Sequence, residues 1–336
     1  MAILRRVNPK TDAIPEPIPD DGLDPEIRRF QQLLAAGYAA HPDLASVTKA
    51  EARRIAEAVR APLAAGGPAM AATDEIVVPG ERPVRVRIHR PRTDAALPAL
   101  VYLHGGGWTL FSIDTHDRLM REYAQRAGVA VVGVDYALAP EARYPVALHQ
   151  VATVVGWLHA GHAPGIDGAR LALGGDSAGG NLALATAMHL RGGVTASSVR
   201  GLVLNYGAFQ RSVESASHRR YSGPAYPLSS TEMVGFWRDY LGDDTRPDDD
   251  PLAQPLCASI DRLRGLPPAW LAVAQCDVLH DDSLAMAERL RAAGVATRCV
   301  VYPRTTHGFV EAMSLAAVSR RALDETAAWL HPLLAA

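Results

Sequence analysis

The sequence predicts a doubly wound α/β fold, in which helices cover both faces of a mostly parallel sheet. Three observations lead to this prediction: short continuous apolar runs typical of buried parallel strands, helical segments between most of them, and ample core-forming residues. Of the 336 residues, 48% are hydrophobic and 21% are charged. This composition argues against disordered, coiled-coil and fibrous proteins.

The chain is expected to begin with a lead-in and two helices. Residues 8–25 are rich in Pro and Asp and predict an extended or mobile segment. Apolar residues then recur at helical spacing over residues 25–38. A capping-box pattern at Thr48 and Glu51 opens a second amphipathic helix toward Val59.

A hairpin and six buried strands should follow. The β-rich runs Glu75–Val78 and Val84–His89 flank Pro79-Gly80, a turn signal that predicts antiparallel pairing. The expected parallel strands are Ala99–Leu103, Val129–Val134, Leu171–Leu173, Leu202–Tyr206, Trp270–Ala274 and Arg298–Tyr302. The expected helices among and after them are Arg118–Ala127, Ala147–His159, Asn181–Leu190, Ser283–Ala293 and Val318–Leu330.

One connection is too long for this alternation. About sixty residues separate Tyr206 from Trp270, and they hold a large share of the aromatic residues. Such an insertion is usually functional, often a lid over a site. The alternative interpretation is a structural excursion whose aromatic side chains fill only its own small core.

Charge and hydropathy restrict the partners. With 34 basic and 36 acidic residues, the formal charge is -2, so no electrostatic signature of nucleic-acid or anionic-membrane binding is present. Apolar runs such as Gly128–Val134 are too short to span a bilayer, and Met1–Lys10 lacks a signal-peptide core. We therefore expect a cytoplasmic protein with a small, weakly charged partner.

The cysteine pattern points to neither a disulfide framework nor a metal cluster. The three cysteines are odd in number and form no C-x-x-C pair. They are expected to be small core residues, and the sequence implies no metal and no organic cofactor.

Gly175-Asp176-Ser177-Ala178-Gly179 matches the pattern G-x-S-x-G between a predicted strand and a predicted helix. A serine at such a tight turn projects its hydroxyl from the carboxyl edge of the sheet, and glycines on both sides allow close backbone approach. Ser177 is therefore predicted to be an exposed, strained nucleophile. The alternative is a purely structural glycine turn.

A nucleophilic serine needs a base, and His307 is the strongest candidate. It follows the strand Arg298–Tyr302 and the loop Pro303–Thr306, which places it at the edge expected for Ser177. The other histidines after Ser177 lack this position, although His280 remains a weak rival. They are His189, His218, His280 and His331.

The base in turn needs an orienting carboxylate. Asp277 ends the strand Trp270–Ala274, whereas Asp281 and Asp282 look like caps of the helix that starts near Ser283. Asp277 is therefore the preferred candidate, with Asp281 as the second choice.

Acyl transfer also requires donors to the developing oxyanion. The residues His104-Gly105-Gly106-Gly107-Trp108 directly follow the strand Ala99–Leu103, so their backbone N–H groups can face an oxygen near Ser177. The Ala178 N–H would complete the hole. Taken alone, the glycines could equally form a flexible turn.

Three segments together resemble the hormone-sensitive-lipase-like branch of the α/β-hydrolase esterases. They are His104–Trp108, Gly-Asp-Ser-Ala-Gly-Gly at 175–180, and Tyr-Ala-Leu-Ala-Pro-Glu at 136–141. The resemblance covers residues 75–330. It implies an α/β-hydrolase fold, a catalytic triad of Ser177, Asp277 and His307, and oxyanion donors at Gly106, Gly107 and Ala178.

The resemblance also implies a domain organisation and an activity. Residues 1–70 would provide N-terminal cap helices, 71–206 and 266–336 the catalytic core, and 207–265 a cap insertion. The implied activity is that of a serine carboxylesterase that hydrolyses short-chain esters through an acyl-enzyme. Family analogy also allows a homodimer.

Some positions depart from the family pattern, and two other functions remain open. Ala137, Gly207 and Val278 replace the usual Arg, Pro and Pro, which puts the pocket shape in doubt more than the reaction. His104 and Glu141 are assigned structural roles. One alternative is an amidase of the arylformamidase kind, which more often has His at the position of Asp176. The other is a non-catalytic small-molecule receptor, in which the histidine of the triad is altered.

Overall fold

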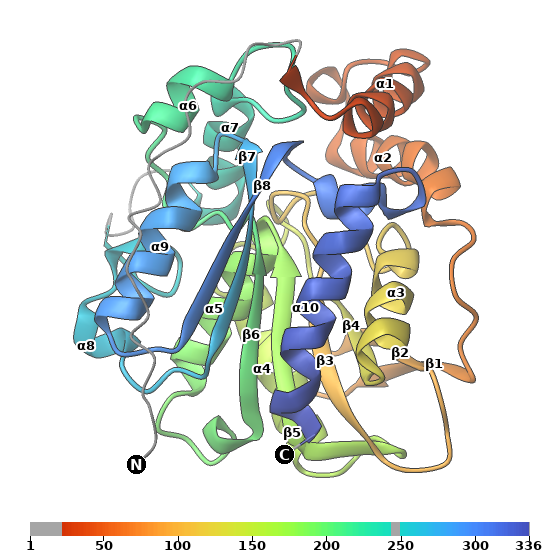
Figure 1. The fold of residues 1–336 in the computed structure, drawn as a ribbon, viewed down its shortest axis with the longest axis vertical. Helices are drawn as coiled ribbons and strands as arrows, with labels where there is room; N and C mark the ends of the chain where they lie inside the picture. Colours follow the sequence, from red (N-terminus) through yellow and green to blue (C-terminus); the bar gives the residue numbers. More distant parts are fainter. Residues whose placement is uncertain (1–21, 243–248, 336) are drawn as a thin grey trace, which may run out of the picture.

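The computed structural model of the protein describes residues 22–242 and 249–335. Its strands form one eight-stranded sheet in the order β1-β2-β4-β3-β5-β6-β7-β8 (Figure 1). The strands are β1 (Ala72–Val78), β2 (Val84–Arg90), β3 (Leu97–Leu103), β4 (Ala130–Asp135), β5 (Ile166–Asp176), β6 (Val199–Asn205), β7 (Ala269–Cys276) and β8 (Thr297–Thr306).

The pairing confirms the predicted hairpin and the parallel sheet. β1 runs antiparallel to β2, with Val78 opposite Val84 across the Pro79-Gly80 turn. β2 is also antiparallel to β4, and all the remaining pairs are parallel. β3 is buried at every position, as expected for an apolar strand covered on both faces.

Helices cover both faces of the sheet, which confirms the doubly wound arrangement. One apolar core lies under α4 (Val146–His159), α5 (Ala178–Leu190) and α9 (His280–Ala292). The other core lies under α3 (Asp117–Ala127) and α10 (Ala317–Ala335). No helix within the described ranges has both the length and the apolar character needed to cross a bilayer.

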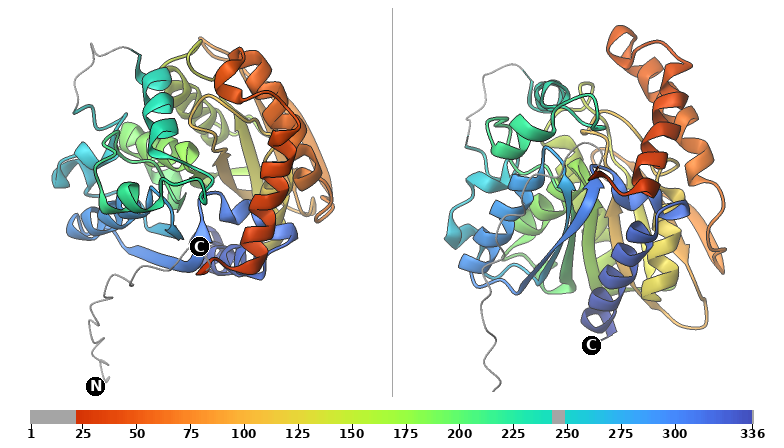
Figure 2. Two further views of the ribbon diagram at one scale, coloured as in Figure 1. Left: turned by 90° about the horizontal axis from the view of Figure 1, so that it is seen from above. Right: turned by 45° about the horizontal axis from the view of Figure 1, so that its top comes forward.

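Four helices gather at one end of the molecule, at the top of Figure 1. They are α1 (Pro25–Ala39), α2 (Lys49–Ala64), α6 (Ala216–Tyr221) and α7 (Ser230–Leu241). Figure 2 shows α1 and α2 as an antiparallel pair beside the α6–α7 segment. Lys49 on α2 pairs with Asp239 on α7 at 2.5 Å, so the two parts of the chain are linked by charge.

The two N-terminal helices begin where the sequence indicated. The Asp24 carboxylate accepts from the Glu26 N–H at 2.8 Å, and the Thr48 hydroxyl accepts from the Glu51 N–H at 3.2 Å. Glu51 pairs with Arg54 instead of closing the predicted capping box. The predicted lead-in at residues 8–25 falls mostly outside the described residues.

The last part of the 207–265 segment does not lie with these four helices. The 3₁₀ turn η4 (Pro255–Cys257) and the short helix α8 (Ile260–Leu263) pack against α9. Only the stretch through α7 therefore lies at the end of the molecule where α1 and α2 are found.

Candidate active site

Ser177 lies at a sharp turn between β5 and α5. Its backbone has φ 55° and ψ −118°, a conformation that L residues rarely adopt and that indicates local strain. A Cβ at Gly175 would lie 2.4 Å from the Leu103 carbonyl oxygen, and one at Gly179 would lie 1.9 Å from the same atom. Glycine is therefore required on both sides of the serine.

His307 joins the serine to a carboxylate. Its Nε2 atom lies 3.0 Å from Ser177 Oγ, and its Nδ1 atom lies 2.8 Å from Asp277 Oδ2. The second oxygen of Asp277 accepts from the Leu279 N–H at 3.0 Å. Because β8 continues to Thr306, His307 directly follows a strand and not the predicted loop. Ser177, Asp277 and His307 thus meet in the order and geometry of a nucleophile, an orienting acid and a base.

Burial and nearby charge shift the pKa of His307 in opposite directions. Burial alone would lower the pKa of His307, but the Asp277 carboxylate outweighs it through charge attraction and its hydrogen bond, and the net shift is upward. The Asp176 and Glu311 carboxylates act in the same direction. An imidazole held this way is a stronger base than a free one.

The other histidines considered have separate partners. His280 Nδ1 lies 3.0 Å from the Ala274 carbonyl oxygen, and His218 Nδ1 lies 2.8 Å from Ser230 Oγ. His331 Nδ1 is 2.9 Å from the Ala127 carbonyl oxygen, while the His189 ring lies beside His149. Each of these contacts holds an element of the scaffold.

Asp281 and Asp282 do not cap a helix, so that prediction was wrong. Helix α9 begins at His280, before both residues, and has no side-chain cap. Asp281 Oδ2 accepts from the Ser217 N–H at 2.9 Å, while Asp282 accepts from Gln210 Nε2 at 2.9 Å. Both carboxylates therefore anchor the 207–265 segment to α9, a long-range role with no local sequence signal.

The glycine loop after β3 faces the serine. Gly106 and Gly107 have φ of 108° and 59°, values that favour glycine. In the described parts of the chain, no acceptor is found for the N–H groups of Gly106, Gly107 and Ala178. All three belong to segments that adjoin Ser177, and Gly106 and Gly107 line the same cavity as its side chain.

Asp176 holds this loop against the serine. Its Oδ1 accepts from the Gly105 N–H at 3.1 Å and from the Tyr102 hydroxyl at 2.9 Å. Its Oδ2 lies 3.4 Å from His116 Nε2. Burial alone would lower the pKa of His116, but the attraction of Asp176 gives a net upward shift.

His104 and Glu141 have the structural contacts expected of them. The His104 ring stacks on Tyr136 with centroids 4.3 Å apart, and its Nδ1 lies 2.7 Å from the Gly105 carbonyl oxygen. Burial, followed by repulsion from His116, lowers the pKa of His104 to about 4. Glu141 pairs with Arg53 of α2, whose Nε also donates to the Thr109 carbonyl oxygen at 2.8 Å.

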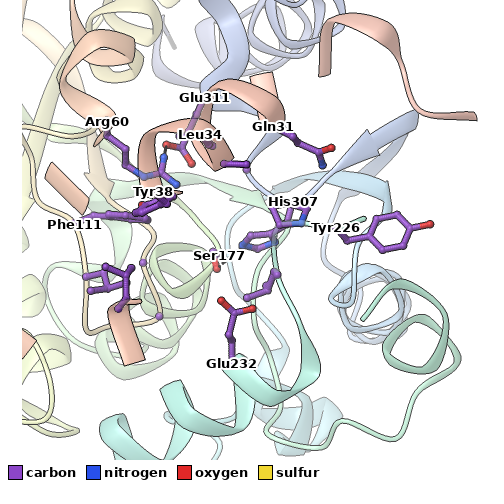
Figure 3. Close-up of a pocket in the computed structure, with 18 of the residues that line it drawn as sticks. Gln31, Leu34, Tyr38, Arg60, Phe111, Ser177, Tyr226, Glu232, His307 and Glu311 are labelled. Atoms are coloured by element: carbon purple, nitrogen blue, oxygen red, sulfur yellow. Dashed lines mark hydrogen bonds and ion pairs between the residues drawn. The ribbon is translucent and has the colours of Figure 1, made fainter. Parts of the chain in front are cut away.

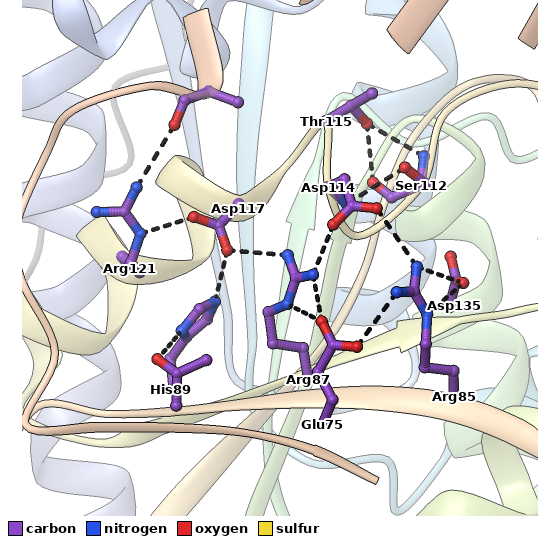
Figure 4. Close-up of polar contacts among 12 residues, drawn as sticks. Glu75, Arg85, Arg87, His89, Ser112, Asp114, Thr115, Asp117, Arg121 and Asp135 are labelled. Atoms are coloured by element: carbon purple, nitrogen blue, oxygen red, sulfur yellow. Dashed lines mark hydrogen bonds and ion pairs between the residues drawn. The ribbon is translucent and has the colours of Figure 1, made fainter. Parts of the chain in front are cut away.

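An ion-pair network supports the segment that follows the glycine loop (Figure 4). Arg87 on β2 donates to Asp114 at 2.6 Å and to Asp117 at 3.0 Å. The buried His89 lies 3.1 Å from the same Asp117 oxygen. The network fixes the start of α3, and with it His116, to strand β2.

A cavity of about 510 Å³ opens above Ser177 and His307. Figure 3 shows Arg60, Tyr38 and Phe111 on one side of the serine, Tyr226 on the other and Glu232 below it. Most of the remaining lining is apolar and comes from α1, the glycine loop and α7: Phe30, Leu34, Leu110, Met233 and Phe236. Helices from both halves of the expected cap therefore line one cavity.

Ser177 is only 6% exposed, so the prediction of an exposed nucleophile was wrong. The turn does present its hydroxyl at the edge of the sheet, but helices α1 and α7 cover that edge and leave the cavity as its surroundings. The sequence pattern describes the elbow alone and carries no information on what covers it.

Sequence reasoning missed three ionisable residues at this site: Arg60, His116 and Glu311. Single atoms of His116, Asp176 and Glu311 lie within 4.8 Å of one another, as metal ligands could. Arg60 already pairs with Glu311, while Tyr102 and Gly105 already donate to Asp176. Since 251 residues separate Arg60 from Glu311, no spacing pattern could have indicated their contact.

The chain is similar to known hydrolases of esters. A family model described as the α/β-hydrolase fold matches residues 100–311. An ethyl acetate hydrolase of Pseudomonas putida is 36% identical over 303 residues, which is 87% of this chain and 93% of that protein. A carboxylic ester hydrolase of Mycobacterium tuberculosis is 35% identical over 257 residues, which is 75% of this chain and 68% of that protein.

A solved structure gives the same result. The hyperthermophilic esterase from the archaeon Pyrobaculum calidifontis superposes with a TM-score of 0.84 at 34% identity. The match covers 94% of this chain and all of that one.

Proposed function

Since the chain belongs to the α/β-hydrolase family, in its hormone-sensitive-lipase-like branch, and is a serine carboxylesterase, we propose that it cleaves short-chain esters with Ser177, Asp277 and His307 as its triad. The observation that supports this assignment is the bridging position of His307, 3.0 Å from Ser177 Oγ and 2.8 Å from Asp277 Oδ2. Such an arrangement lets one imidazole move a proton while a carboxylate holds its orientation.

The reaction proceeds in two halves. His307 takes the proton of Ser177 as the hydroxyl oxygen attacks the ester carbonyl carbon, then gives it to the leaving alcohol. In the second half, His307 takes a proton from the water that attacks the acyl-enzyme and returns it to Ser177 Oγ as the bond between Oγ and the acyl carbon breaks and the carboxylic acid leaves. Asp277 stabilises the imidazolium that forms in each half.

The oxyanion would lie against Gly106, Gly107 and Ala178. Their N–H groups have no acceptor among the described residues, and the first two lie in a loop tied to Asp176 through Gly105. Donors fixed in this way need no rearrangement when negative charge develops on the carbonyl oxygen.

The substrate is assigned from the cavity and its covering helices. We assign the helices of 1–70 and the 207–265 segment, through α7, to a cap over the residues of 71–206 and 266–336. A mostly apolar cavity of about 510 Å³ suits a small acyl chain. Relatives named ethyl acetate hydrolase and acetyl esterase support a short acyl group.

The test uses nitrophenyl esters of increasing acyl length with a fluorophosphonate probe. We expect the probe to label Ser177. The Ser177→Ala protein should neither hydrolyse the esters nor be labelled. Labelling of another serine would contradict the assignment. Nitroanilides of the same acyl groups, measured in parallel, should be cleaved far more slowly, and faster amide cleavage would favour an amidase instead.

Location and assembly are further proposals. We expect the enzyme in the cytoplasm and, by analogy with the family, as a homodimer. Cell fractionation tests the first, and light scattering after gel filtration tests the second. A monomer at micromolar concentration would remove the dimer from the proposal without affecting the triad.

A further inference from the structure

Arg60 forms a largely buried contact between the cap and the core. It lies on α2, and its guanidinium pairs with the Glu311 carboxylate, each side chain being 11% exposed. The guanidinium carbon also lies 3.9 Å from the centroid of the Phe111 ring. Figure 3 shows this group on one side of Ser177.

The Phe111 contact leads to the proposed oxyanion hole. A Cβ placed on Gly106 would lie 2.7 Å from Phe111 Cδ2 and 2.3 Å from the Leu110 carbonyl oxygen, so the ring packs directly on this glycine. Phe111 has φ 69°, a strained value that the surrounding contacts must maintain. The Arg60 guanidinium lies over this ring.

The Glu311 contact leads to the proposed base. Glu311 lies on η5 (Phe309–Ser314), and its N–H donates to the Gly308 carbonyl oxygen at 3.0 Å, in the turn that begins at His307. One side chain of the cap therefore contacts the loop of the oxyanion donors and the segment that carries the base.

The charges around Arg60 explain why a cation is needed there. An oxygen of Glu311 and one of Asp176 lie within 4.8 Å of each other and of a ring nitrogen of His116. Two buried carboxylates at this separation repel each other unless cations compensate them. Arg60 compensates Glu311. Asp176 gives the pKa of His116 a net upward shift, which favours the protonated ring that would compensate Asp176.

We propose that Arg60 is a positioning residue. When α2 packs on the core, Arg60 aligns the Gly106 loop with the segment that carries His307. The site is then fully active only when the cap helix is in place. This inference rests on the roles proposed above for Gly106 and His307. Arginine suits the task because its planar guanidinium can stack on an aromatic ring and pair with a carboxylate at the same time.

The charged and titratable groups around His307 make the role measurable. They are Asp277 after β7, Asp176 at the end of β5, Glu311 on η5 and Tyr206 after β6, with Arg60 and His116 behind the two carboxylates. Because Glu311 raises the pKa of His307, Glu311→Gln should lower the acid midpoint of kcat/KM. Arg60→Met leaves the Glu311 charge uncompensated and should raise that midpoint.

The experiment compares five variants: Arg60→Met, Arg60→Lys, Glu311→Gln, the double variant Arg60→Met/Glu311→Gln, and Arg54→Ala. Arg54 lies on the same helix and pairs with Glu51 at the surface, with its side chain 70% exposed, so it is the matched control. Each variant is measured for kcat and KM on nitrophenyl acetate, for the pH profile, for fluorophosphonate labelling rate and for thermal unfolding.

We expect Arg60→Met to lower kcat and the labelling rate by about 10²-fold, the effect of one misplaced oxyanion donor, with KM changed by less than about threefold. The kcat and labelling rate of Arg60→Lys should lie between those of Arg60→Met and wild type, because lysine keeps the charge and loses the stacking. Removing both charges should restore thermal stability, since no buried charge is left unpaired, while kcat stays low. Arg54→Ala should match wild type.

The results separate this inference from the proposed function. Two results would contradict the positioning role: a double variant with normal kcat, or an Arg60→Met enzyme in which KM alone rises and the pH midpoint does not shift. Either would mean that Arg60 only attaches the cap to the core. If an Arg60→Met protein fails to fold, the double variant and Arg60→Lys decide the question. Wild type that is not labelled at Ser177 would instead contradict the triad itself.

Discussion

The Gly105 N–H donates to Asp176 Oδ1 across 3.1 Å, and this contact ties the glycine loop to the residue before the nucleophile. The loop follows β3 and the nucleophile follows β5, and these two strands pair in parallel with Leu103 opposite Gly175. A Cβ on Gly105 would lie 2.4 Å from Asp176 Oδ2, so the carboxylate lies directly against the loop. Asp176 therefore fixes the distance between the proposed donors and Ser177.

Asp176→Asn should lower kcat by roughly 10²-fold with little change in KM, because the loop loses its charged acceptor and the donors move. The amide also leaves His116 without its counter-charge, so His116→Gln in the same protein should recover part of the stability lost. Steady-state kinetics and thermal unfolding of the single and double variants check this. Normal kcat in Asp176→Asn would show that Gly105 needs no carboxylate.

As the pH is lowered, kcat/KM should fall with a midpoint that lies above the pKa of free imidazole. His307 must be neutral to accept the serine proton, and Asp277 gives its pKa a net upward shift despite burial. We therefore expect kcat/KM to lose half its value at a pH higher than about 6.5. The Glu311→Gln and Asp277→Asn enzymes should both move this midpoint downward. A midpoint well below that of imidazole would exclude His307 as the base.

Substitution of the two candidate carboxylates, Asp277 and Asp281, should lower kcat to very different extents. Asp277→Asn removes the acceptor that holds the His307 tautomer and should lower kcat on the order of 10⁴-fold. Asp281→Asn should stay within about threefold of wild type, because the amide oxygen can still accept from the Ser217 N–H. Measuring kcat of both variants suffices, and the opposite ranking would mean that Asp281 is the acid of the triad.

Gly106→Ala should inactivate the enzyme by steric displacement. The new Cβ would lie 2.3 Å from the Leu110 carbonyl oxygen, at a φ of 108° that alanine rarely adopts. We expect kcat to fall by roughly 10²-fold as the donors move. Gly128→Ala is the control, since Gly128 has φ 65° with open space around it. It should cost about 1 kcal/mol of stability and leave kcat unchanged. Equal kcat losses in both variants would show that backbone strain, not the clash, is responsible.

The strands and the site motifs could be predicted because their signals are local. A buried parallel strand is a continuous apolar run, so β3 was evident at Ala99–Leu103 although it begins two residues earlier. Ser177 and the glycines of 105–107 lie beside such strands, and the order of the strands brings them together. His307 and Asp277 could be predicted for the same reason: each follows a parallel strand, and the carboxyl ends of parallel strands meet at one edge of the sheet.

The rest depends on contacts between distant segments. Asp281 and Asp282 follow a strand and open a helix, which resembles local capping, but their partners are Ser217 and Gln210. Arg60 looks like an ordinary surface arginine of an amphipathic helix until α2 is placed on the core. Polar groups of this kind are paired by tertiary packing, which periodicity and spacing do not describe.

The wall of the cavity makes a prediction about acyl length. Phe236 on α7 lies against Gly107, where a Cβ would meet its ring at 2.3 Å, and it lines the same cavity as Ser177. Since each buried methylene contributes roughly 0.8 kcal/mol, selectivity should rise about fourfold per carbon until the chain meets the wall. We expect a kcat/KM optimum at about two to six carbons for wild type and a steep fall by about ten carbons.

Phe236→Ala should move that optimum toward longer chains, because the space of the ring becomes available to the acyl group. Val234→Ala is the matched control, since Val234 lies on the same helix, is 49% exposed and does not line the cavity. Rates on nitrophenyl esters from acetate to decanoate measure the shift, and the control should keep the wild-type profile. An unchanged optimum in Phe236→Ala would mean that the acyl chain lies in another part of the cavity, away from the Phe236 ring. Val234→Ala altering the profile as much as Phe236→Ala would instead indicate that movement of α7, rather than the ring itself, controls chain length.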